Sequence, residues 1–180
     1  MLLPVSQSRI KVILDGLYFD ARTQRGKGTA FERLVRQFLL TDPRHAERFD
    51  EVWMWSDWPE RGARPDRGID LVARERETGE LCAVQCKFYD PDTGVITKGD
   101  VDSFLAESGT GEFTSRLFVS TTEHWNSAAE ETVSRQAIPV SRVGLEDLFN
   151  STIDWDSFSL ETPEVMVRTG GKSLREHQKR

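Results

Sequence analysis

The sequence is poor in the features that mark membrane insertion, secretion or a histidine-based site. No apolar run approaches the ~20 residues needed to cross a bilayer. The N-terminus lacks the basic and apolar segments of a secretory signal. The three histidines of the sequence are far from one another, so they form neither a metal-ligand spacing nor a catalytic triad. We therefore expect a cytoplasmic protein with no membrane association and no histidine-based site.

Cysteine is also scarce, and its spacing excludes a disulfide. Cys82 and Cys86 lie in one segment of strand-type residues. At ~3.3 Å per residue, their Cα atoms would be roughly 13 Å apart, beyond disulfide reach. Two reduced core thiols are the expectation, as in a cytoplasmic protein.

Positive charge is in deficit, with 24 Lys and Arg against 30 Asp and Glu and a net charge of −6. Nucleic-acid-binding domains usually carry a basic footprint, so this balance does not by itself indicate one. The charge is unevenly spread, however, and a local basic patch is enough to guide a phosphate backbone. The candidates for DNA contacts are Arg61, Arg64, Arg67 and Lys98.

A length of 180 residues with 37% hydrophobic and 30% charged residues predicts one globular domain. Helices are predicted over 6–19, from 29 to before Pro43, from 100 to 105, over 127–135 and around 145–148. Strands are predicted over 52–55, 69–74, 81–89, 116–120 and 138–143. The two central strands form a hairpin and the later strands arrive through helices. This order predicts an α/β sandwich with a mixed sheet of about four to five strands flanked by helices.

The hairpin over 68–89 carries the residues best suited to catalysis. Side chains alternate between the faces of a strand, so Gln85 and Lys87 share one face while the cysteines enter the core. A turn at Thr78-Gly79 brings Asp70 opposite Gln85 or Lys87, within the ~5 Å of a cross-strand pair. An acid, an amide and an amine are therefore expected to converge.

These three groups suit the hydrolysis of a phosphodiester. Asp70 would bind Mg²⁺ directly, and Gln85 would offer its amide oxygen as a second ligand. Lys87 would orient or deprotonate the attacking water, or neutralise charge in the transition state. Asp66 competes with Asp70 as the metal-binding acid. Asp70 is preferred because apolar neighbours place it on a strand, whereas Asp66 lies in an arginine-rich loop.

Glu32 has two interpretations, and the sequence leaves both open. If Thr29 opens its helix, Thr29 to Glu32 form a capping box, in which the glutamate satisfies a backbone N–H at the helix start. Alternatively, the carboxylate is a further metal ligand or orients the metal site.

Asp70 followed fifteen residues later by Gln85-Cys86-Lys87 resembles the PD-(D/E)XK nuclease signature in its Gln-x-Lys variant, typical of the Mrr-like restriction branch. Thr29 to Glu32 resembles the first helix of that branch, and Phe118 to Thr122 a later strand. The resemblance extends from about Gly28 to Leu148. With Trp55 to Pro59 before the acid, the pattern is similar to the N-terminal nuclease domain of type ISP single-polypeptide restriction-modification enzymes.

This resemblance implies a restriction-endonuclease-like sandwich over residues 1–160 that cuts double-stranded DNA with Mg²⁺. It implies further domains of the same polypeptide, joined through a linker over 161–180. One of them would be a helicase-type motor, which alone would use ATP. Transient pairing of two nuclease domains would produce double-strand cuts. Gly171-Lys172-Ser173 is not a P-loop, because Met166 stands where the first glycine is required.

Two other functions stay open at this point. The first is a catalytically silent DNA-binding or docking module, which the net acidity and the glutamine in place of a carboxylate favour. The second is a junction-resolvase-type repair nuclease with the same core, which would cut branched DNA as a stable dimer.

Overall fold

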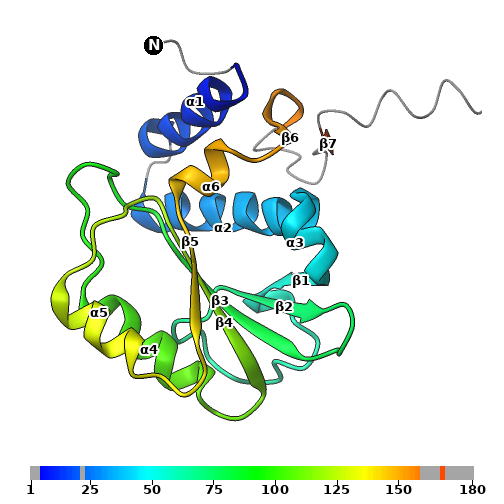
Figure 1. Cartoon of the computed structure of the whole chain (residues 1–180), viewed down its shortest axis with the longest axis vertical. Coiled ribbons are helices and arrows are strands. Elements are labelled where there is room, and N and C mark those ends of the chain that lie inside the picture. The colour runs from blue at the N-terminus through cyan, green and yellow to red at the C-terminus, as the bar shows by residue number, and fades with distance from the viewer. Residues whose placement is uncertain (1–4, 21–22, 159–166, 169–180) are drawn as a thin grey trace, which may run out of the picture.

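The computed structural model describes residues 5–20, 23–158 and 167–168 (Figure 1). The helices are α1 (Val5–Asp20), α2 (Gln24–Thr41), α3 (Pro43–Arg48), α4 (Lys98–Ser108), α5 (Ser127–Ser134) and α6 (Leu145–Phe149). The strands are β1 (Phe49–Met54), β2 (Leu71–Glu75), β3 (Leu81–Lys87), β4 (Phe113–Ser120), β5 (Val140–Val143), β6 (Ile153–Asp154) and β7 (Val167–Arg168). No helix among these residues is long and apolar enough to cross a membrane.

The first five strands form one mixed sheet in the order β1-β2-β3-β4-β5. The pairs β1·β2 and β2·β3 are antiparallel, and the pairs β3·β4 and β4·β5 are parallel. Parallel neighbours need a crossover, and α4 and α5 provide it. The predicted α/β sandwich with a central mixed sheet is thereby confirmed.

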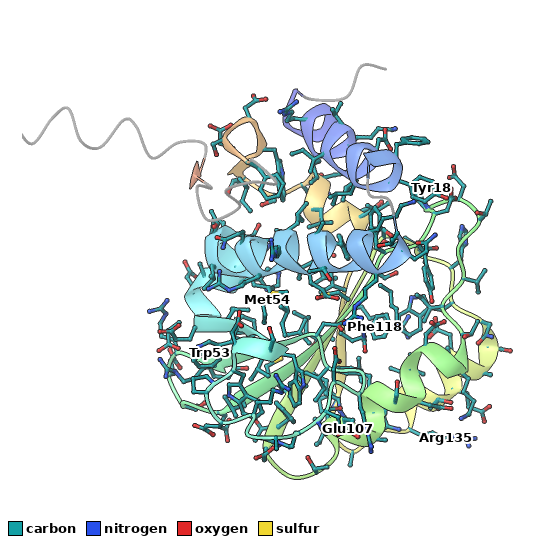
Figure 2. All side chains as sticks on the ribbon, turned by 180° about the vertical axis from the view of Figure 1, so that it is seen from behind. Tyr18, Trp53, Met54, Glu107, Phe118 and Arg135 are labelled. Carbon is teal, nitrogen blue, oxygen red and sulfur yellow. The ribbon has the colours of Figure 1, made fainter. Side chains whose placement is uncertain are left out.

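The sheet is covered on both faces, by α2 on one and by α4 and α5 on the other (Figure 1). Side chains of β3 alternate between the two cores: Cys82, Val84 and Cys86 pack on the α2 side, and Ala83 on the other. Phe118 of β4 lies between the sheet and the second helical layer, which α4 and α5 form (Figure 2). Both cysteines are buried and free, as the spacing predicted.

Helix α2 has the predicted apolar stripe but begins earlier than predicted. Its apolar stripe is buried as predicted: Phe31, Leu34, Val35, Phe38 and Leu39. Its predicted start at residue 29 is wrong, because the helix begins at Gln24. The hydroxyl of Thr23 accepts the Gly26 N–H at 3.0 Å, and this cap lets the helix run through two glycines of low helix propensity. Thr29 is thus inside the helix, and the capping-box interpretation of Glu32 is wrong.

The other boundaries shift by a few residues. Strand β2 begins one residue after Asp70, and β3 ends at Lys87 rather than at residue 89. The helix predicted from residue 100 begins at Lys98 with Thr97 as its cap, so Asp100 lies in its first turn. The predicted linker over 161–180 lies outside the described residues, apart from β7.

Candidate active site

Asp70 stands where β2 separates from β3. Its backbone N–H donates to Val84 O at 2.9 Å, and its carbonyl accepts the Trp55 N–H at 2.8 Å. Two residues earlier, Gly68 has φ +95°, and a Cβ there would lie 2.8 Å from Ser103 Oγ of α4. Only glycine fits this close approach in a left-handed conformation. The chain therefore turns away from β3 immediately before Asp70. This turn leaves the Asp70 carboxylate at the point where β2 and β3 separate.

The Asp70 carboxylate completes the hydrogen-bond ladder of the sheet. Its Oδ2 accepts the Cys86 N–H at 2.7 Å, the place that a backbone carbonyl of a continuing strand would take. The side-chain Nε2 of the buried Gln85 donates to the same oxygen. No hydrogen bond to Asp70 Oδ1 is found among the described residues, so this oxygen is available to a ligand. The predicted contact between Asp70 and Gln85 is present.

Glu32 of α2 is close enough to Asp70 for the two charges to interact. Burial and then the charges of Asp70 and Asp66 raise the pKa of Glu32 to about 7. Burial is also the main cause that raises the pKa of Asp70 to about 6, against the lowering effects of the Cys86 N–H and Lys87. Two carboxylates in a half-buried site repel one another, and a bound cation would relieve this repulsion.

Lys87 lies beside these acids and pairs with Asp100 in the first turn of α4. Its Nζ is 3.7 Å from Asp100 Oδ1, and the Tyr89 hydroxyl donates to that same oxygen. The other oxygen of Asp100 accepts the N–H and the hydroxyl of Thr97, each at 2.8 Å. Burial and the neighbouring Asp100 raise the pKa of Tyr89 to about 12, so its hydroxyl stays a donor. Asp100 reaches Lys87 through the packing of α4 on the sheet.

The basic residues predicted to bind DNA lie on the loop before Asp70 and at the start of α4. Arg61 and Arg64 brace their own loop, each Nε donating to the carbonyl of the other at 2.9 and 3.0 Å. The Arg64 guanidinium also lies 4.8 Å from the centre of the Trp58 ring. Lys98 pairs with Asp102 on the exposed face of α4 at 2.7 Å. Arg67 is exposed on the loop before Asp70.

A cation could use a donor set of two carboxylates and one amide. Asp70, Glu32 and Gln85 supply the hard oxygen ligands that Mg²⁺ prefers. No group of three or more His, Cys, Asp or Glu side chains in the described part of the chain has the arrangement of a metal site. The third donor would therefore come from Gln85, whose amide nitrogen is the atom turned toward Asp70. The donor chemistry fits a hard cation bound partly by water.

Comparison with known proteins gives independent information on this chain. A family model described as a restriction endonuclease matches residues 40–165. Among solved structures, the ATP-dependent type ISP restriction-modification enzyme LlaBIII bound to DNA is 36% identical, with a TM-score of 0.72. The match covers 92% of this chain and 10% of LlaBIII, so the chain spans about a tenth of that enzyme.

A second solved structure, a protein of unknown function designated AF1548, is 19% identical with a TM-score of 0.43. That match covers 67% of this chain and 64% of AF1548. The search of curated proteins gave no match.

Proposed function

Because this chain belongs to the Mrr-like family of restriction endonucleases, we propose that its Asp70 site hydrolyses phosphodiester bonds of double-stranded DNA with a bound Mg²⁺. One observation carries the proposal. An acid with a free oxygen, a second acid of raised pKa and a lysine meet where two strands of the sheet separate. Such a set can bind a cation, a phosphate and a water together.

Each residue has a distinct part in this proposal. Asp70 and Glu32 would bind the cation through carboxylate oxygens, and Gln85 would hold Asp70 in place and offer its own amide oxygen. The bound ion supplies Lewis-acid polarisation of the phosphate and stabilises the leaving oxygen. Lys87, fixed by Asp100, would orient the attacking water or offset charge that develops on the phosphate.

A plasmid assay tests the proposed activity directly. The chain is incubated with supercoiled plasmid and Mg²⁺, and parallel samples contain excess chelator. Conversion to the nicked form is expected only with Mg²⁺. Equal conversion in the chelator would contradict the metal requirement, and no conversion in either sample would contradict the nuclease itself.

We also propose that this domain acts within a larger restriction-modification polypeptide of the cytoplasm. The 36% identity to LlaBIII over 92% of this chain supports this organisation. In it, other domains would recognise the target and only a motor domain would use ATP. Two copies of the nuclease would meet transiently to cut both strands. Phosphate contacts position a protein whereas base contacts specify sequence, so this site alone would show little sequence preference.

A catalytically silent DNA-binding module is the second candidate. It is favoured by one observation, the amide of Gln85 at the position where the commoner PD-(D/E)XK signature has a carboxylate. The two candidates differ in metal binding. A nuclease site should be stabilised by Mg²⁺, because a ligand that binds only the folded state raises the melting temperature. A silent module need not respond.

Replacing Glu32 with Gln is expected to stabilise the metal-free protein at pH 8. A carboxyl with a raised pKa destabilises the fold when it is charged. For Glu32 this penalty is absent below the ordinary pKa of 4.5, grows as pH rises, and is complete above about 7. The melting temperature of Glu32→Gln should therefore exceed that of the unsubstituted protein at pH 8 and equal it at pH 4. The gain is about 2–4 °C for each kcal/mol of repulsion removed.

The same variant should respond less to Mg²⁺ at pH 8, because one carboxylate ligand is lost. Thermal denaturation with and without the metal measures both effects. A gain of equal size at pH 4 and pH 8 would contradict the raised pKa. An undiminished response to Mg²⁺ would contradict a ligand role for Glu32.

Replacing Gln85 with Glu is expected to make the fold depend on metal. Gln85 is 4% exposed and its amide donates to Asp70, so a glutamate would set two carboxylates against each other. The melting temperature at pH 8 should fall by several degrees without metal and recover with Mg²⁺. Gln37 is also a buried glutamine, but it lies on α2. The variant Gln37→Glu is therefore the matched control. It should be destabilised too, but Mg²⁺ should not restore it.

A further inference from the structure

Helix α2 carries positive charge in an acidic protein. It contains Arg25, Lys27, Arg33 and Arg36 against Glu32 as its only acid, so four basic groups less one acid give +3. The protein as a whole has a net charge of −6. By contrast, α4 has one basic residue and three acids, and α5 has two acids and no basic residue. The second helical layer is therefore acidic, and α2 is a basic strip above the opposite face of the sheet.

Two of the four basic groups on α2 have structural partners. Arg36 Nε donates to Val52 O of β1 at 2.7 Å, and Lys27 Nζ lies 4.5 Å from the centre of the Tyr18 ring. Arg25 and Arg33 are exposed, and no hydrogen bond or ion pair to either is found among the described residues. Their guanidinium groups are therefore open to a ligand from outside.

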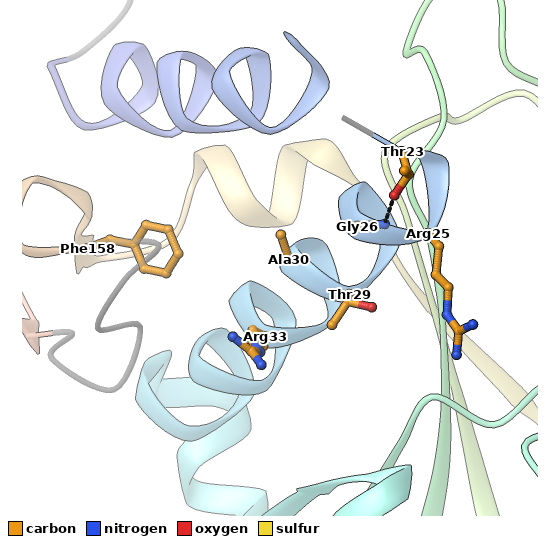
Figure 3. A pocket seen from close by; sticks show the side chains of 7 residues that line it. All are labelled: Thr23, Arg25, Gly26, Thr29, Ala30, Arg33 and Phe158. Carbon is orange, nitrogen blue, oxygen red and sulfur yellow. Dashed lines mark hydrogen bonds between the residues drawn. The ribbon is translucent and has the colours of Figure 1, made fainter. Parts of the chain in front are cut away.

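Arg25 and Arg33 line one pocket of about 400 Å³ together with Thr29, which lies between them on the helix (Figure 3). The spacing of four residues keeps the three side chains on one stripe, and the two arginines are ~12 Å apart along the helix axis. Thr29 adds a hydroxyl that can donate to an anionic oxygen. This distance lets the two guanidinium groups reach separate phosphates of one DNA backbone.

The stripe borders the candidate active site. At 3.6 residues per turn, Arg25, Thr29, Glu32 and Arg33 fall within ~100° of the helix circumference. Glu32, at the edge of this set, is the member on which the charge of Asp70 acts. A backbone lying along the stripe would therefore lead to the acids of the site. The predicted loop arginines Arg61 and Arg64 offer no such route, because they brace their own loop.

We propose that Arg25, Thr29 and Arg33 form a phosphate-binding stripe that seats the backbone of double-stranded DNA beside the Asp70 site. This inference rests on the proposed nuclease function for the identity of its ligand. It adds the surface that positions the substrate. Binding there would be independent of sequence and sensitive to salt, because each phosphate contact releases condensed counterions.

The double variant Arg25→Ala/Arg33→Ala tests the stripe by equilibrium binding. Its affinity for a fluorescent 30-bp duplex is measured by anisotropy in excess chelator, where no cleavage occurs, over a range of salt concentrations. The variant should bind at least ~10-fold more weakly at low salt. The slope of log K against log salt should fall by about 2, one unit for each lost phosphate contact.

Arg135→Ala is the matched control, since Arg135 is an exposed arginine at the end of α5 in the other helical layer (Figure 2). Its affinity and slope should equal those of the unsubstituted protein. Arg25→Lys/Arg33→Lys keeps the charge and should recover most of the affinity, and equal melting temperatures should show that all variants are folded. Unchanged affinity and slope in the alanine variant, or no binding by the unsubstituted protein, would overturn the stripe. Absence of plasmid nicking with binding still dependent on Arg25 and Arg33 would count against the nuclease and not against the stripe.

Discussion

Asp70→Asn is expected to reduce Mg²⁺-dependent plasmid nicking by ~10³-fold while the fold is retained. A metal ion contributes several kcal/mol to transition-state stabilisation, and each 1.36 kcal/mol is a factor of ten in rate. Asparagine removes the charge that binds the cation but keeps the shape of the side chain. Its carbonyl oxygen can take the position of Oδ2 and accept from Cys86 and Gln85. Its NH₂ group then replaces the oxygen that was available to a ligand.

The stability of this variant supplies a second measurement. Burial raises the pKa of Asp70 to about 6, so the charged form destabilises the fold above that pH. Asp70→Asn should therefore melt at the same temperature as the unsubstituted protein or higher at pH 8, and Mg²⁺ should raise that temperature much less. Loss of nicking with a lower melting temperature would indicate a structural role for Asp70 instead.

Asp66→Asn is the matched control for the choice between the two acids. Asp66 is exposed on the loop, and its charge raises the pKa values of Glu32 and Asp70. Its removal should leave nicking at neutral pH within a few-fold of the unsubstituted rate. Loss of activity in Asp66→Asn with activity kept in Asp70→Asn would reverse the assignment of the metal-binding acid.

Lys87→Met is expected to lower the rate of nicking by ~10²–10³-fold, the effect of removing one preorganised group that stabilises developing charge. Methionine keeps most of the apolar stem of the half-buried lysine, so the packing of β3 should survive. The loss should fall on kcat, with little change in the affinity for DNA, because a charge used in the transition state contributes little to ground-state binding.

The pH profile separates a catalytic Lys87 from a structural one. The ammonium group lowers the pKa of Asp70, so its removal should move the rise of activity with pH to higher pH. Lys11→Met, at an exposed lysine of α1 paired with Asp15, should change neither rate nor profile. A Lys87→Met protein that nicks at the unsubstituted rate would remove Lys87 from the mechanism.

The hairpin and the contact between Asp70 and Gln85 could be predicted from the sequence because they depend on short-range rules. Alternation along β3 separates the core cysteines from Gln85, and the turn at Gly79, with φ +75°, sets the register that pairs the segment with β2. These rules relate residues close in the chain. The apolar stripe of α2 could be predicted for the same reason, since its period of 3.6 residues does not depend on the rest of the fold.

The start of α2 could not be obtained in the same way. Two glycines lower the helix propensity of the residues before Thr29, but local propensity is a weak effect that a cap and tertiary packing can outweigh. That error also produced the capping-box interpretation of Glu32. With Thr23 as the cap, Glu32 lies inside the helix, where the charge of Asp70 acts on it.

The mixed α/β sandwich and the pairing of Asp70 with Gln85 follow from the sequence, because the periods of strands and helices and the geometry of a hairpin are local. The sequence did not predict that Asp100 pairs with Lys87, or that the charge of Asp70 acts on Glu32, 38 residues earlier. These interactions join different layers of the fold. Their distances depend on how the helices pack on the sheet, which no local pattern specifies.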